Sequence, residues 1–159
     1  MATHAQRAAK AKKAKRATRT QRRAAHHHKP HRPAGNFTVG CEDAYGDTYR
    51  WHSGSTVAMR DLGNGGPWIC MILLTGQHSV TGAIEERLFV TNEEIFASPQ
   101  EAYQYGMRFI EDELGVEYIG DDDICSIKVL DREKGMGTEY IGEDATIRRS
   151  VKLLTGRDV

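Results

Sequence analysis

The first 33 residues of this chain cannot contribute to a hydrophobic core. They contain eleven Lys or Arg, no Asp or Glu, and no Leu, Ile, Val or Phe. A segment without sizeable apolar side chains cannot offset the conformational entropy that ordering costs. We therefore expect a disordered or conditionally helical arm at 1–33 and one domain at 34–159.

The charge of the chain follows the same division. The sequence has 22 basic and 22 acidic residues, so its formal net charge is zero. Because the arm holds eleven of the basic residues and no acidic one, residues 34–159 keep eleven basic and 22 acidic residues. A basic arm joined to an acidic domain indicates a polyanion as the partner of the arm.

The arm has the composition of a helix that forms on its target. Ala, Lys, Arg and Gln, which dominate residues 5–25, have high helix propensity. Repulsion between like charges opposes the helix in water, and phosphates would remove that repulsion. Pro30 and Pro33 end any such helix. In its Ala and Lys content the arm resembles the tails of linker-histone-like proteins, and this resemblance covers the arm alone.

Phosphate contacts are the interaction that this arm can make. Each Lys or Arg placed near a phosphate releases a condensed counterion, which drives binding. The arm lacks aromatic residues for stacking on bases, so we expect it to bind DNA or RNA without sequence specificity. The predicted nucleic-acid-binding residues are Lys10, Lys12, Lys13, Lys15, Arg16, Arg19, Arg22 and Arg23.

Two other roles of the arm stay open. Residues 12–15 fit a short nuclear-import pattern, and the arm could also serve as a tether. A transit peptide or a membrane anchor would need an apolar helical face or residues that insert into lipid, and the arm has neither. We expect no membrane contact.

Five histidines of the arm suggest titration rather than metal binding. They are His4, His26, His27, His28 and His31. The surrounding positive charge disfavours a bound cation, so we predict no metal site and no cofactor. Imidazole has an unperturbed pKa of about 6.5, so the arm gains charge as the pH falls.

The domain at 34–159 is large enough for one core without disulfides. Its cysteines, Cys41, Cys70 and Cys125, are three in number and form no CxxC pair. The longest apolar run, 68–74, is far too short to cross a membrane, and no hydrophobic leader is seen. We expect an intracellular protein of the cytoplasm, nucleoid or nucleus.

Period-2 alternation and a later change to helical spacing predict an α+β domain. Ser98, Pro99 and Glu101 combine an N-cap, a first-turn proline and a capping box. Inward-facing residues then recur at helical spacing, namely Tyr103, Met107, Ile110 and Leu114. We expect an antiparallel β-meander with two helices, at about 98–114 and 143–154, over one face. The expected strands are 36–41, 47–52, 56–60, 68–75, 87–91 and 124–130.

The sequence of the domain contains no convincing catalytic motif. Gly63–Gly66 lacks the Lys-Ser/Thr of a P-loop and is better interpreted as a hairpin turn. Asp121–Asp123 lacks the spacing of a calcium loop. Either His52 or His78 could act as a base beside one of the cysteines, but no local pattern pairs them.

Three aromatic residues, Tyr45, Tyr49 and Trp51, could stack on single-stranded bases, but core packing is the simpler interpretation. We therefore predict a non-enzymatic nucleic-acid-associated protein whose acidic domain serves protein interaction or self-association. The alternatives are an interaction module with the arm as targeting signal or tether, and a small enzyme using a Cys or His.

Overall fold

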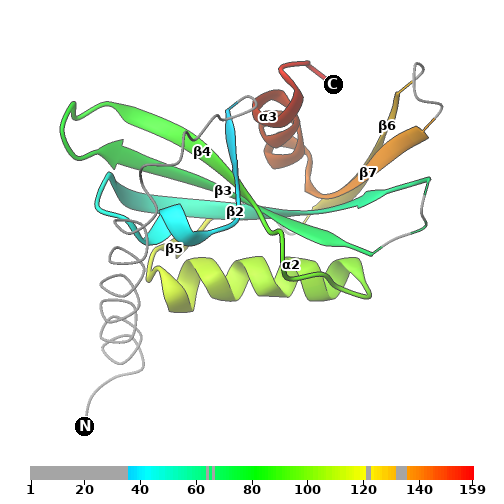
Figure 1. The fold of residues 1–159 in the computed structure, drawn as a ribbon, viewed down its shortest axis with the longest axis horizontal. Helices are drawn as coiled ribbons and strands as arrows, with labels where there is room; N and C mark the ends of the chain where they lie inside the picture. Colours follow the sequence, from blue (N-terminus) through cyan, green and yellow to red (C-terminus); the bar gives the residue numbers. More distant parts are fainter. Residues whose placement is uncertain (1–35, 64, 66, 121–122, 132–135) are drawn as a thin grey trace, which may run out of the picture.

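The structure is a computed structural model that describes residues 36–63, 65, 67–120, 123–131 and 136–159. It confirms the α+β fold: a mixed β-sheet lies between two helices, one on each face (Figure 1). The strands are β1 (Phe37–Val39), β2 (Tyr49–Asp61), β3 (Ile69–His78), β4 (Ile84–Val90), β5 (Glu117–Tyr118), β6 (Ile124–Asp131) and β7 (Met136–Glu143). The helical segments are η1 (Glu42–Tyr45), α2 (Pro99–Arg108), η2 (Phe109–Glu113) and α3 (Asp144–Thr155).

The sheet is built on an antiparallel meander. Its strand order is β1-β4-β3-β2-β7-β6, and β5 pairs with β2 beside this path. Strands β2, β3 and β4 form the expected meander, and β6 and β7 form a hairpin. Two short pairings, β1 with β4 and β2 with β5, are parallel and make the sheet mixed.

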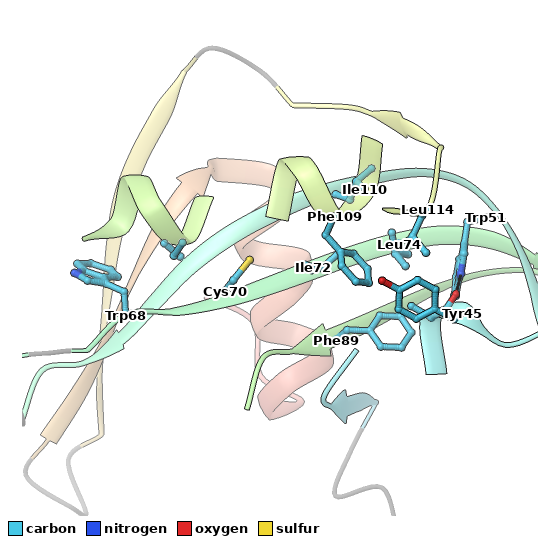
Figure 2. Close-up of a cluster of buried hydrophobic side chains, with 13 residues drawn as sticks. Tyr45, Trp51, Trp68, Cys70, Ile72, Leu74, Phe89, Phe109, Ile110 and Leu114 are labelled. Carbon is cyan, nitrogen blue, oxygen red and sulfur yellow. Dashed lines mark hydrogen bonds between the residues drawn. The ribbon is translucent and has the colours of Figure 1, made fainter. Parts of the chain in front are cut away.

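One face of the sheet is covered by α2 and η2. Phe109 and Ile110 meet Ile72 and Leu74 of β3 in a cluster that extends to Trp51 and Phe89 (Figure 2). The opposite face is covered by α3, whose Ile147 and Val151 pack among Val57, Met71 and Leu88. The expectation that both helices share a face is therefore wrong. The strands of the meander carry apolar side chains on both faces of the sheet, so a helix must pack on each face to bury them.

The first predicted helix begins where the sequence indicates. The hydroxyl of Ser98 accepts from the amide of Glu101 at 3.2 Å, and the Glu101 carboxylate accepts from the amide of Ala97. The last turn widens into the π-helical η2, where the amide of Leu114 donates to the carbonyl of Phe109. Gly115 follows at φ +65°, as a C′ glycine should.

Several boundaries differ from the predicted ones. Segment 56–60 and all but the first two residues of segment 47–52 belong to one long strand, β2, which continues through a bulge between Trp51 and Ser53. Strands β5 and β7 were not expected. In β7 the glycines Gly137 and Gly142 weaken the period-2 signal, although its Tyr140 is buried.

Candidate nucleic-acid interface

All predicted phosphate contacts lie outside the described residues. The eight basic residues from Lys10 to Arg23 belong to the arm, as do the five predicted titrating histidines. The described part of the chain shows the charge of the domain surface and the place where the arm joins the domain.

The domain begins at the edge of the sheet. The amide of Asn36 donates to the carbonyl of Leu153 in α3 at 3.2 Å, and Phe37 packs into the cluster beneath α3. Since β1 is the terminal strand of the sheet path, the arm joins the domain at this edge.

The described surface is acidic. Of the 22 acidic and eleven basic residues in 34–159, the structure describes the side chains of 18 and nine. Acidic residues follow one another in η1, with Glu42 and Asp43, and in η2, with Glu111, Asp112 and Glu113. The Tyr45 hydroxyl donates to Glu113 and joins these two segments. A phosphate backbone would be repelled from this part of the surface.

All three cations of α3 are engaged in ion pairs. Arg148 bonds Asp144 at 2.9 Å, Arg149 bonds Glu86 at 3.0 Å, and Lys152 lies 3.6 Å from Asp158. These pairs reduce the attraction that α3, the most basic described element, would exert on a phosphate.

The aromatic residues considered for base stacking belong to the core. Tyr45 is buried against Phe109 in an edge-to-face contact with ring centroids 5.6 Å apart. Trp51 is 8 % exposed, and its indole N–H donates to the carbonyl of Ala44. Tyr49 stacks on Trp51 at 4.9 Å and packs against this cluster. The core interpretation is confirmed.

The best-defined polar network of the described residues is centred on Glu139. Its carboxylate accepts from the guanidinium of Arg60 at 2.8 Å and from the hydroxyl of Ser126 at 2.9 Å. Burial alone would raise the pKa of Glu139, but these two hydrogen bonds and the charge of Arg60 hold it below its ordinary value. The guanidinium also lies 4.7 Å from the Trp68 ring centroid. Every member of this network thus has a structural partner.

Among the described residues, Cys70 is buried in the core and His78 takes part in a turn. Burial, followed by the proximity of Cys41, raises the pKa of the Cys70 thiol well above its ordinary value, which disfavours the thiolate. The Nδ1 atom of His78 accepts from the amides of Val80 and Thr81 and so closes the turn between β3 and β4. His52 is exposed on β2.

The glycine-rich segment is also explained by the fold. Gly63 and Gly65 lie in the connection between the antiparallel strands β2 and β3, which agrees with a hairpin turn. Asp121 and Asp122 lie outside the described residues. Within the described ranges, no group of His, Cys, Asp and Glu is arranged to hold a metal ion.

One polar pair was not found by sequence reasoning. The hydroxyl of Tyr118 in β5 donates to that of Tyr103 in α2 and links strand to helix. Burial, followed by this hydrogen bond, raises the pKa of Tyr118. A two-residue strand has no readable period, so no sequence signal could have placed Tyr118 there. A shallow depression on α2 and η2 is lined by Gln104, Arg108 and Glu111.

Comparison with protein-family models, with curated proteins and with solved structures found no match. Among the described helices, none has the length and apolar content needed to span a bilayer.

Proposed function

We propose that this protein is a non-enzymatic nucleic-acid-associated protein whose basic arm binds DNA or RNA phosphates without sequence specificity. The observation that supports it is the separation of charge between the arm and the domain. Counterion release scales with the number of cations that meet phosphates, and the arm concentrates eleven of them in 33 residues with no acidic neighbour.

In this proposal, the acidic domain repels the nucleic acid that the arm binds. A duplex attracted to the arm is repelled by the carboxylates of η1 and η2, so it contacts the chain chiefly through the arm. The domain then serves protein interaction or self-association. The buried aromatic residues and the turn contacts of His78 favour this role over base recognition or catalysis.

A salt titration of the full chain on a random-sequence duplex tests the proposal. If six to eight cations engage, log K falls against log salt with a slope of about −5 to −7. Changing Lys12, Lys13, Lys15 and Arg16 together to Gln should reduce the steepness by about 3.6, or 0.9 for each lost contact.

The matched control removes the same charge from the folded domain. Changing Arg148, Arg149, Lys152 and Arg157 to Gln lowers the net charge by the same four units but should leave the slope within experimental error. An equal loss of slope in both variants, or no complex at low salt, would refute the arm as the binding element.

A further inference from the structure

The outer edge of β6 carries an unusual combination of open backbone groups and exposed apolar side chains. β6 ends the strand path, and no described strand pairs with its outer side. Leu130 is 73 % exposed and Ile124 is 46 % exposed, although both lie within a strand of the sheet. Such an edge is a template for pairing with another strand.

The register of the sheet identifies which backbone groups are open. The amide of Leu62 donates to the carbonyl of Gly137, so the peptide groups of Gly137 face β2. Alternation along an antiparallel strand then directs the groups of Thr138 toward its β6 partner Val129. The peptide groups of Val129 therefore face β7, and those of its neighbours Lys128 and Leu130 face away from β7. The outward groups therefore belong to Ile124, Ser126, Lys128 and Leu130.

The side chains of these four residues share one face of the sheet. Ser126 bonds Glu139 and lies opposite Ile141, which packs into the cluster beneath α2. Because α2 packs over β2 and β3, this face of β6 is left partly open, whereas α3 covers the other face (Figure 1).

We propose that β6 pairs antiparallel with β6 of a second copy of this chain, with the two-fold axis at Ile127. In this register, each Ile124 lies opposite Leu130 of the other copy, and each Ser126 lies opposite Lys128. Cys125 lies opposite Val129, and Ile127 lies opposite itself. The two most exposed apolar residues of β6 thereby cover each other, and all four outward backbone groups acquire partners.

The neighbouring registers are less favourable. Directly opposed residues of an antiparallel pair place their side chains on the same face of the sheet. The nearest alternative registers therefore have the two-fold axis at Ser126 or at Lys128. An axis at Lys128 places two like charges directly opposite each other, which is destabilising. An axis at Ser126 places Ile124 opposite Lys128 and leaves Leu130 without an apolar partner. The pattern of β6 thus favours a second copy of itself in one register.

The test is the oligomeric state of the full chain. Sedimentation equilibrium should give twice the 17.8 kDa chain mass at tens of micromolar. Leu130→Glu should weaken dimerisation at least tenfold, because it removes an apolar contact and places a carboxylate beside Ile124. Val80→Glu is the matched control, since Val80 is 88 % exposed in the turn between β3 and β4. A monomeric wild type, or equal dimerisation of both variants, would overturn the proposal.

Cross-linking tests the register separately. With Cys125 changed to Ser, Ile127→Cys should form an intermolecular disulfide on oxidation, because facing residues at the axis lie about 4.5 Å apart between Cα atoms. Ile124→Cys in the same background should not cross-link to itself, since the two copies of residue 124 are about 20 Å apart along the strands. Circular dichroism checks that both variants fold. The reverse pattern would refute this register.

This proposal makes one of the two proposed roles of the domain specific, namely self-association. Its failure is distinguishable from failure of the arm proposal. A monomer that still binds DNA with a steep salt slope would refute only the β6 interface. A dimer that binds no DNA would refute only the arm.

Discussion

Replacing Gly106 with Ala tests whether packing overrides helix propensity in α2. An interior Ala favours a helix by about 1 kcal/mol over Gly, so propensity alone predicts stabilisation. A Cβ on Gly106, however, would lie 2.1 Å from Cγ2 of Thr56 and 2.8 Å from Sγ of Cys70. Carbon atoms in contact are normally about 3.5–4.0 Å apart. Both neighbours are buried, so the helix must move away from the sheet.

Crowding of this kind costs about 1–3 kcal/mol or more. Set against the gain of about 1 kcal/mol in helix propensity, Gly106→Ala should lower the free energy of unfolding by up to about 2 kcal/mol. Urea denaturation followed by circular dichroism measures this change as a lower midpoint at unchanged slope. Gln104→Ala is the control: it introduces Ala at an exposed position of the same helix and should change stability by less than about 0.5 kcal/mol.

A second substitution attributes the loss to the contact with Thr56. Thr56→Ser removes Cγ2, so the double variant should recover at least about 0.5 kcal/mol relative to the sum of the single changes. An increase in stability of Gly106→Ala by about 1 kcal/mol would refute the packing argument. A loss without coupling to Thr56→Ser would place the strain elsewhere.

Three further outcomes follow from the structure and the arm. Gly156→Ala, at φ +76° after α3, should cost about 1 kcal/mol in urea denaturation, because an L residue is strained there. Glu139→Gln should lower the free energy of unfolding at pH 7, and the difference from wild type should disappear in acid. The pKa of Glu139 is lower in the folded state than in the unfolded state. The ionised carboxylate therefore stabilises the fold above the unfolded pKa, and this stabilisation is lost as the pH falls through the folded pKa. The histidines of the arm should tighten DNA binding at pH 6 relative to pH 8 at matched ionic strength; equal affinities would exclude them.

Local signals in the sequence located the helices well. Ser98, Pro99 and Gly115 marked the ends of the first helical segment because capping depends on neighbouring residues alone. The inward residues were only partly right: Ile110 and Leu114 are fully buried, but Tyr103 and Met107 are half-buried. The π-helical turn after Arg108 shifts the apolar face, and a period fixed at 3.6 residues cannot anticipate such a turn.

Long-range features were beyond a single sequence. Which face of the sheet each helix covers depends on how the chain crosses from β4 to α2 and from β7 to α3, and no local pattern encodes this. Likewise, the partnership of Arg60 with Glu139 joins residues that are 79 positions apart. For the candidate site, the charge of the arm follows directly from its composition. A contact with phosphate, however, depends on a partner outside the chain.

The two proposals reinforce each other through the position of the arm. Each arm joins the domain at β1, and the proposed interface lies at β6, the opposite end of the strand path. A dimer would have twelve strands in line, with its two arms joined at edges about 50 Å apart for a strand spacing of about 4.8 Å. Two arms on one duplex raise the apparent affinity without any new type of contact. Leu130→Glu should therefore weaken DNA binding more than Val80→Glu, which adds the same charge, and the difference should vanish at concentrations too low for dimers. A persistent difference there would show that the β6 edge acts on the arm other than through a second copy.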